Sequence, residues 1–230
     1  MDIEAHRLNA AQLSGGISNS SIYAAALSAA KAQGGEIRNI LDYGSGAGRF
    51  IPILASTFPR ATIAGADIME RPDGLSAAAN WIRGDLNYTL PAAANSFDLV
   101  FAVEVIEHLE NPRQMLRDIN RMLTPGGVAV LTTPNPGSLR SLLTFVARGH
   151  HANFDDSNYP AHITVMTAVD FKRAGNETGF EPPQFFYTNV GCVPKLLKLK
   201  WQDVPGVGGL FRGKFFSDNY GAVLRKPVIC

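Results

Sequence analysis

The sequence predicts an α/β fold with a doubly wound, mostly parallel sheet. Three observations support this. Residues 39–50 form an apolar run that is interrupted by glycines and then resumes, which is typical of a strand, a glycine loop and a helix. A second short apolar run, at 61–67, ends on an acid. Residues 97–103 are almost continuously apolar, as expected of a parallel strand covered on both faces, and we expect this strand to be central.

Length and composition restrict the class of protein. The chain has 230 residues, of which 46% are hydrophobic and 18% charged, so we expect one soluble domain spanning 1–230. A net charge of +1 gives no indication of bulk nucleic-acid binding and leaves the oligomeric state open. Cys192 and Cys230 form no disulfide framework. Because no basic leader and no membrane-spanning apolar run is present, we expect a cytoplasmic protein.

Two helices are predicted ahead of the first strand. They cover residues 3–13 and 20–33, are separated by the breaker at 14–16, and have Asn19 or Ser20 as a cap. Residues 1–37 therefore form a helical cover over the first strand. Arg7 and Tyr23 are within reach of a pocket there, although ordinary packing is the commoner role for such residues.

The glycine loop predicts a nucleotide-type pocket. Gly44, Gly46 and Gly48 allow positive φ and close approach of a ligand to the backbone, and the helix that follows contains Pro52 in its first turn. The dinucleotide fingerprint would need glycine where this chain has Arg49. Asp42 precedes the loop, and its carboxylate would repel a pyrophosphate but attract the ammonium and sulfonium of S-adenosylmethionine.

Asp67 has the spacing of a ribose-binding acid. It follows Gly48 by 19 residues and ends the second strand, where a carboxylate can accept hydrogen bonds from both ribose hydroxyls.

The segment Leu-Asp-x-Gly-x-Gly-x-Gly resembles the first motif of the class I S-adenosylmethionine-dependent methyltransferases. Motifs over roughly 38–135 agree with this resemblance, including the turn Leu-x-Pro-Gly-Gly at 123–127. It implies a Rossmann-like sheet of seven strands with helices on both faces and an antiparallel edge strand, here 219–225. It also implies that Asp85 contacts the adenine amine, and that Ile68, Leu86 and Val103 line the cofactor pocket.

The segment Glu104-Val105-Ile106-Glu107-His108 follows the central strand, where ligands of parallel sheets bind. On a helical turn, the two glutamates and the histidine would share one face. His108 is the candidate general base. Alternatively, the segment resembles the E-x-x-E-H sequence of metal-assisted ubiquinone-pathway and small-RNA 3′-terminal methyltransferases, with Mg²⁺ bound and His162 as a fourth ligand. A purely structural His108 is the third possibility.

Beyond residue 135 the sequence leaves the shared core. We expect an amphipathic helix over 138–147 with its apolar stripe in the core, a substrate loop over 149–160, a helix over 167–179 and a strand over 183–190. Residues 136–182 would form a substrate-side insertion. For 195–201 a surface helix with snorkelling lysines is favoured over a membrane-resting segment.

These features predict an S-adenosylmethionine-dependent methyltransferase that modifies an oxygen atom of a small-molecule or glycan-type acceptor. The oxygen acceptor is favoured because the chain lacks the Asn/Asp-Pro-Pro-Tyr/Phe pattern of the resembling amino-group methyltransferases. An NAD-dependent oxidoreductase and a non-catalytic ligand-binding protein are the alternatives.

Overall fold

The computed structural model describes residues 3–14, 18–194 and 196–228. The helices, including four short 3₁₀ helices labelled η, and the strands follow one another in this order: α1 (Ile3–Leu13), α2 (Ser20–Lys31), β1 (Asn39–Tyr43), α3 (Phe50–Thr57), β2 (Thr62–Asp67), β3 (Asn80–Arg83), β4 (Phe97–Val103), η1 (Ile106–His108), α4 (Pro112–Met122), β5 (Leu123–Pro134), α5 (Leu139–Arg148), α6 (Ala168–Glu177), β6 (Gln184–Tyr187), β7 (Cys192–Val193), β8 (Leu196–Lys200), η2 (Trp201–Asp203), η3 (Gly208–Leu210), η4 (Lys214–Phe216) and β9 (Asn219–Arg225).

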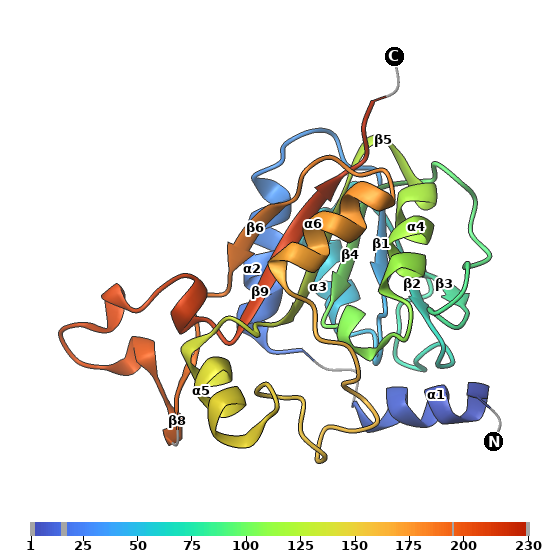
Figure 1. Cartoon of the computed structure of the whole chain (residues 1–230). Coiled ribbons are helices and arrows are strands. Elements are labelled where there is room, and N and C mark those ends of the chain that lie inside the picture. Colours follow the sequence, from blue (N-terminus) through green and yellow to red (C-terminus); the bar gives the residue numbers. More distant parts are fainter. Residues whose placement is uncertain (1–2, 15–17, 195, 229–230) are drawn as a thin grey trace.

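The main sheet has seven strands in the order β3-β2-β1-β4-β5-β9-β6, which confirms the predicted fold class (Figure 1). The strands β1 to β5 pair in parallel, and β4 lies in the middle of the sheet as expected. The strand order reverses between β1 and β4. Ligands of open α/β sheets bind beyond the carboxyl ends of the strands at such a switch point.

The predicted position of the antiparallel strand needs a correction. β9 is antiparallel, but it is not at the edge, because it pairs with β5 on one side and with β6 on the other. β6 forms the edge. Burial explains the difference, since five successive residues of β9, 220–224, are buried, and such a strand needs neighbours on both sides.

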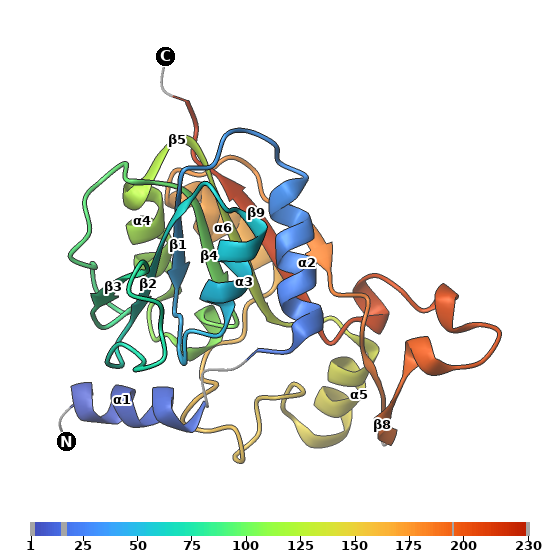
Figure 2. The same cartoon turned by 180° about the vertical axis from the view of Figure 1, so that it is seen from behind.

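Helices cover both faces of the sheet and produce two cores (Figure 2). On one face α2 and α3 pack on the strands through side chains such as Ile22, Ala26 and Leu54. On the other face α4 and α6 do so through side chains such as Leu116 and Phe171. Alternate residues of β4 point into the two cores, so this strand joins them.

Local signals determine where the first helices begin. The side chain of Asn19 accepts a hydrogen bond from the backbone N–H of Ser21, so Asn19 is the N-cap of α2, as predicted. Pro52 lies in the first turn of α3, where its missing N–H costs nothing. Residues 15–16 of the predicted breaker lie outside the described residues.

Two predictions beyond residue 135 are wrong. Residues 196–200 are not helical but form strand β8, which pairs with β7; Lys195 lies outside the described residues. The alternation of leucine and lysine over 197–200 has period two, which suits a strand. The predicted helix at 138–147 is present as α5, but its apolar stripe is exposed and does not join the core.

Residues 149–167 contain no helix or strand, in agreement with the predicted loop. None of the helices in the described part of the chain is both long and apolar enough to cross a membrane.

Candidate active site

A cavity of about 320 Å³ opens at the carboxyl ends of β1 and β4. Its walls come from α1, α2, the glycine loop, η1 and the loop before α6. Most of the residues predicted as cofactor-binding or catalytic line it together: Asp42, Gly44, Gly46, Asp67, Ile68, Asp85, Leu86, Val103 and His108. Gly48 is not among the lining residues.

The glycine loop forms a close turn against the cavity. Gly44, Gly46 and Gly48 all have positive φ, which favours glycine. A Cβ on Gly44 would also collide with the side chain of Val105, so this glycine is required by packing as well. Gly48 has a different role, because it completes the turn and does not line the cavity. Its φ is +72°, and its N–H donates a hydrogen bond to the carbonyl of Ser45.

Asp42 is a buried carboxylate without a full set of partners. Its Oδ2 atom is buried and has no hydrogen-bond partner among the described residues. Burial raises the pKa of Asp42 to about 7. A cationic group in the cavity would supply the missing partner and favour the ionised form. The residue therefore fits a ligand that carries an ammonium or sulfonium group, as predicted from its position.

Asp67 connects the glycine loop to the end of β2. Its Oδ2 atom accepts the N–H of Gly46 at 2.8 Å, and its Oδ1 atom accepts the N–H of Met69 at 3.0 Å. Burial raises the pKa of Asp67, while these backbone donors oppose that rise. Each carboxylate oxygen can accept a second hydrogen bond, so the side chain can still receive ribose hydroxyls.

Arg7 attaches α1 over the cavity. The helix has no buried residue, but Nη1 of Arg7 lies 2.6 Å from Asp85 and Nη2 lies 2.7 Å from Glu110. These contacts raise the pKa of Arg7, and the hydrogen bond to Glu110 has the largest effect. Because Asp85 is paired with Arg7, an adenine amine would have to share its carboxylate with the guanidinium. Tyr23 also lines the cavity and stacks on Phe50 at a centroid distance of 4.4 Å.

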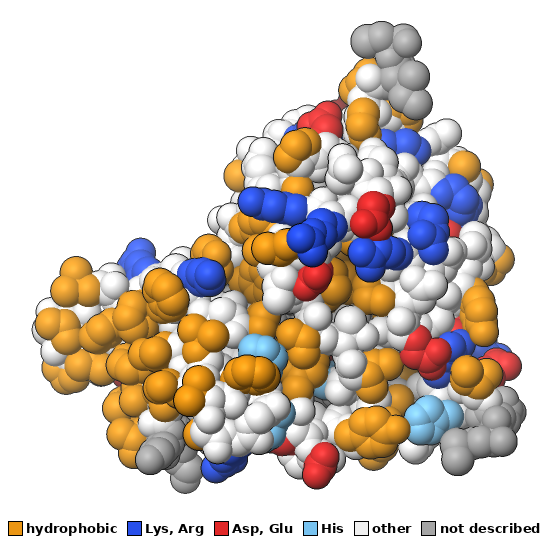
Figure 3. Space-filling view, viewed as in Figure 1, with side chains coloured by type: hydrophobic (Ala, Val, Ile, Leu, Met, Phe, Trp, Pro, Cys, Tyr) orange, Lys and Arg blue, Asp and Glu red, His pale blue; other side chains and the backbone are white. Residues whose placement is uncertain are grey.

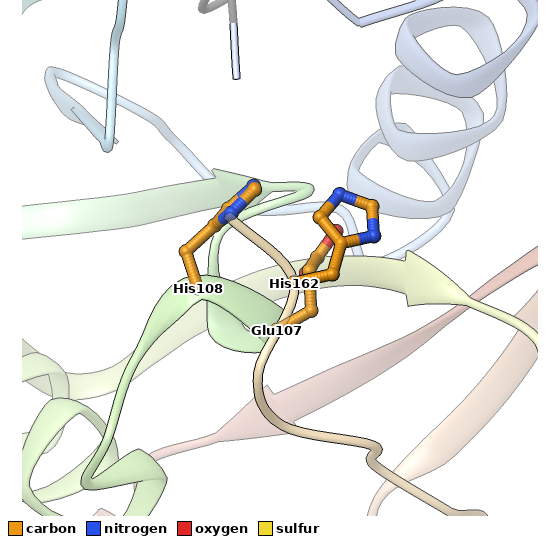
Figure 4. A group of neighbouring side chains, drawn as sticks. All are labelled: Glu107, His108 and His162. Atoms are coloured by element: carbon orange, nitrogen blue, oxygen red, sulfur yellow. The ribbon is translucent and has the colours of Figure 1, made fainter. Parts of the chain in front are cut away.

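Glu107, His108 and His162 form a cluster in the cavity wall (Figure 4). One ligand atom from each lies within 4.8 Å of the others. The two histidine rings meet edge to face, with centroids 4.9 Å apart. The backbone carbonyl of Glu107 accepts the N–H groups of Ile163 and Thr164, both at 2.9 Å. These bonds fix the loop that carries His162 beside η1.

Both histidines are held in one tautomer. The Nδ1 atom of His108 lies 2.7 Å from the carbonyl oxygen of Ala161, and Nδ1 of His162 lies 2.7 Å from that of Asn153. A carbonyl only accepts, so Nδ1 carries the proton in each ring, and Nε2 is the nitrogen that can accept a proton or bind a cation. Burial lowers the pKa of both rings, so His108 is neutral near pH 7.

Glu104 does not lie on a helical turn with Glu107 and His108, which corrects the expectation from helical spacing. It precedes η1 and has a φ of +56°, and it is not part of the cluster of Glu107, His108 and His162, although it lines the same cavity. Its Oε2 atom accepts Nδ2 of Asn219 at 2.6 Å, and its buried Oε1 atom has no partner among the described residues. Burial raises the pKa of Glu104, and the charge of Glu107 adds to this.

Glu107 is also buried, and burial raises its pKa to about 8. Its Oε2 atom accepts the hydroxyl of Thr133 at 3.1 Å, and its Oε1 atom has no partner in the described structure. The cluster thus offers one carboxylate and two imidazoles. Imidazole nitrogen suits zinc, iron or copper, whereas Mg²⁺ requires mainly oxygen ligands, so these donors do not fit the Mg²⁺ considered from the sequence.

Sequence reasoning missed the outer partners of the site, which are Ser45, Asn87, Glu110, Thr133 and Asn219. Asn87 donates its backbone N–H to Asp85, and its own side-chain oxygen accepts the N–H of Glu110. The contacts of Asn87 with Glu110, of Thr133 with Glu107 and of Asn219 with Glu104 join residues that are distant in the chain, and no local pattern marks them. Two contacts are local: Asn87 is two residues from Asp85, and the hydroxyl of Ser45 donates to the carbonyl of Asp42 three residues earlier.

This chain is similar to known methyltransferases. A family model described as a methyltransferase domain matches residues 17–184, which is more than half of the chain. Among curated proteins, the chain is 32% identical over 114 residues to malonyl-[acyl-carrier protein] O-methyltransferase of Legionella pneumophila, with 46% of this chain and 40% of that protein covered. It is 28% identical over 205 residues to the mitochondrial ubiquinone biosynthesis O-methyltransferase of Schizosaccharomyces pombe, with 83% and 70% covered. The first four such matches cover between 21% and 54% of the relatives' lengths.

Solved structures share the fold. A SAM-dependent methyltransferase from Archaeoglobus fulgidus superposes with a TM-score of 0.60 at 20% identity, covering 90% of this chain and 95% of that one. A phosphoethanolamine N-methyltransferase from Haemonchus contortus with S-adenosyl-L-methionine gives 0.59 at 16% identity, covering 88% and 52%.

Proposed function

Because the chain belongs to the class I S-adenosylmethionine-dependent methyltransferases, we propose that it transfers a methyl group to an oxygen atom of a small-molecule or glycan-type acceptor. The observation that carries the cofactor assignment is Asp42, a buried carboxylate with an unpartnered oxygen, beside a glycine loop at the switch point of the sheet. In this proposal Asp67 binds the ribose and Asp85 contacts the adenine of that ligand. Oxidoreduction with NAD is disfavoured, because Asp42 would repel a pyrophosphate.

The chain's own contribution to the reaction is to position the acceptor and to take its proton. S-adenosylmethionine, when bound, supplies a methyl group on a positively charged sulfur. His108 is neutral near pH 7, and its Nδ1–H is held by the carbonyl of Ala161. Its Nε2 atom therefore accepts the proton that an acceptor hydroxyl loses as the oxygen bonds to the methyl carbon.

The acceptor side of the cavity is formed by the segment 136–182. Pro160, His162 and Ile163 from this segment line the cavity opposite the glycine loop, whereas α6 in the same segment packs into the core through Phe171. We assign residues 149–163 to acceptor recognition. The malonyl-[acyl-carrier protein] and ubiquinone-pathway relatives are O-methyltransferases by name, which supports an oxygen acceptor.

A metal-assisted variant of this function rests on the cluster of Glu107, His108 and His162. Both imidazoles have their Nδ1 atoms fixed by backbone carbonyls, the arrangement that orients histidine ligands toward a metal. A cation there would satisfy the unpartnered Oε1 of Glu107 and hold an acceptor oxygen. Proton transfer to His108 and ligation by His108 exclude each other, so one experiment separates them.

That experiment is a methyl-transfer assay with labelled S-adenosylmethionine against hydroxyl- and carboxyl-bearing acceptors, run with and without a chelator, which abolishes activity only if His108 is a metal ligand. We expect label on oxygen, and we expect loss of turnover in His108→Gln but not in the control Arg60→Gln, whose side chain is exposed and lies outside the cavity lining. Label found only on nitrogen or carbon, or no transfer to any acceptor despite cofactor binding, would contradict the proposed function.

A further inference from the structure

The helix α5 presents its polar side to the protein and its apolar side to the solvent. Arg140 points inward, where its guanidinium lies 3.2 Å from Asp218. Ser141 is buried and its hydroxyl lies 3.0 Å from Nδ1 of His151. A surface helix of a soluble protein normally has the opposite arrangement, with its apolar stripe on the core.

The outward side of α5 is entirely apolar over its central turns. Val146 is 85% exposed, and the other exposed side chains on this side are Leu142, Leu143 and Phe145. This is not the incidental exposure of single residues, because four large apolar side chains lie on consecutive turns. Contiguous apolar patches on soluble proteins mark interaction sites.

A neighbouring segment continues this surface. Residues 191–217, which we call the projecting lobe, extend from the main sheet next to α5 (Figure 1). The side chain of Asn135, just before α5, donates to the backbone carbonyls of Lys214 and Ser217 and fastens the lobe. Leu210 is 79% exposed, and further exposed apolar side chains in the lobe are Leu196, Leu199, Val207 and Phe215. Figure 3 shows hydrophobic side chains gathered over this part of the molecule.

Positive charge is concentrated in the same region. The lobe carries one acid, Asp203, against five basic residues: Lys195, Lys198, Lys200, Arg212 and Lys214. α5 contains Arg140 and Arg148 and no acid. The net charge of the whole chain is only +1, so the rest of the protein is net negative. An apolar surface with basic residues at its margin is complementary to an anionic lipid bilayer, which offers buried acyl chains and phosphate headgroups.

We propose that α5 and the projecting lobe together dock the protein on the surface of an anionic lipid bilayer. The exposed leucine, valine and phenylalanine side chains enter the boundary between headgroups and acyl chains, and the exposed side chains of Arg148, Lys200, Arg212 and Lys214 contact phosphates. Docking requires no methyl transfer and goes beyond the proposed function. α5 lies at the same end of the sheet as α1, which lines the cavity, whereas the lobe projects to the side away from α1 (Figure 1).

The test is co-sedimentation of the full chain with vesicles. We expect the protein to sediment with vesicles of equal parts phosphatidylglycerol and phosphatidylcholine, and not with phosphatidylcholine alone. The double variant Val146→Gln/Leu210→Gln should weaken binding by about tenfold or more, because two side chains lose their burial in the bilayer. The control Val169→Gln changes an exposed valine on α6 and should bind like the wild type.

A second pair of variants measures how much the basic residues contribute to vesicle binding. Arg148→Glu/Arg212→Glu should also weaken binding to the anionic vesicles by about tenfold, given the attraction of each basic residue to an anionic surface, while Arg60→Glu should not. Absence of sedimentation with anionic vesicles would overturn the proposal. An equal loss of vesicle binding in the control variants Val169→Gln and Arg60→Glu would also overturn it. Concentration-dependent self-association without lipid that Val146→Gln/Leu210→Gln abolishes, together with no vesicle binding, would assign the surface to a second copy of the chain instead.

Discussion

Asp42→Asn should make the protein more stable at pH 8 while weakening its binding of the cofactor product. Burial raises the pKa of Asp42 from 3.8 to about 7, so the folded protein without ligand holds a proton there that the unfolded chain releases. Between these two values stability falls as pH rises, since the folded state binds more protons. At pH 8, above both pKa values, the buried carboxylate lowers the free energy of unfolding by its full amount.

The magnitude follows from the shift. About three pKa units at ~1.4 kcal/mol each give an upper value of about 4 kcal/mol. The asparagine amide must be buried in the same place, which costs about 1 to 3 kcal/mol if it finds no partner. We therefore expect a net gain of about 2 kcal/mol at pH 8, which for a chain of this size raises Tm by roughly 4 to 8 °C. Near pH 4 most of the linkage cost is absent and only the amide cost remains, so the variant should there be less stable than the wild type by about 1 to 2 kcal/mol.

Thermal unfolding across this pH range measures the stability, and calorimetry with S-adenosylhomocysteine measures the binding. Wild-type affinity should increase as pH rises toward 7, because the ligand's ammonium requires the ionised carboxylate, and the variant should lack this dependence. Asp118→Asn is the control of opposite sign, since it removes a buried carboxylate that is paired with Arg121 at 2.7 Å and should destabilise the fold. Destabilisation by Asp42→Asn at pH 8, or a pH profile parallel to the wild type, would refute the reasoning.

Three further predictions follow from the site. Asp67→Ala should weaken binding of S-adenosylhomocysteine by about 1 to 3 kcal/mol in calorimetry, the scale of hydrogen bonds to a charged group, and an unchanged Kd would place the ribose elsewhere. His108→Ala should lower turnover by roughly 10² to 10⁴-fold with nearly intact cofactor affinity, and the wild-type rate should fall in acid, at a lower pH than for an ordinary histidine because burial lowers the pKa of the ring; loss of activity with a chelator would instead assign His108 to a metal. Arg7→Met should release α1, which has no buried residue, and make it sensitive to limited proteolysis; equal cleavage rates for variant and wild type would contradict a role for Arg7 as its attachment.

The first half of the fold could be predicted because its signals are local. The strand, glycine loop and helix around Gly44 follow from turn chemistry and apolar runs, and the end of β2 at Asp67 follows from spacing alone. The position of β9 within the sheet could not be predicted, because it depends on which strands pair across the chain. Residues 196–200 mix basic and apolar residues, which also suits a surface helix with snorkelling lysines, and a period of two over four residues is too short to distinguish a strand from a helix.

The candidate site was predicted in part for the same reason. Residues at strand ends converge in the cavity by topology, so Asp42, Asp67 and His108 were found. The bond between Arg7 and Glu110 joins residues 103 apart in sequence, and no spacing indicates it. Helical spacing predicts that Glu104 shares a turn with Glu107, whereas its positive φ and the start of η1 at Ile106 place it outside that turn.

The central claim is that the cavity beside the glycine loop binds S-adenosylmethionine. Titration calorimetry of the full chain with S-adenosylhomocysteine, and separately with NAD, tests it most directly. We predict saturable binding of S-adenosylhomocysteine at one site per chain and no binding of NAD. Tight binding of NAD together with no binding of S-adenosylhomocysteine would contradict the claim.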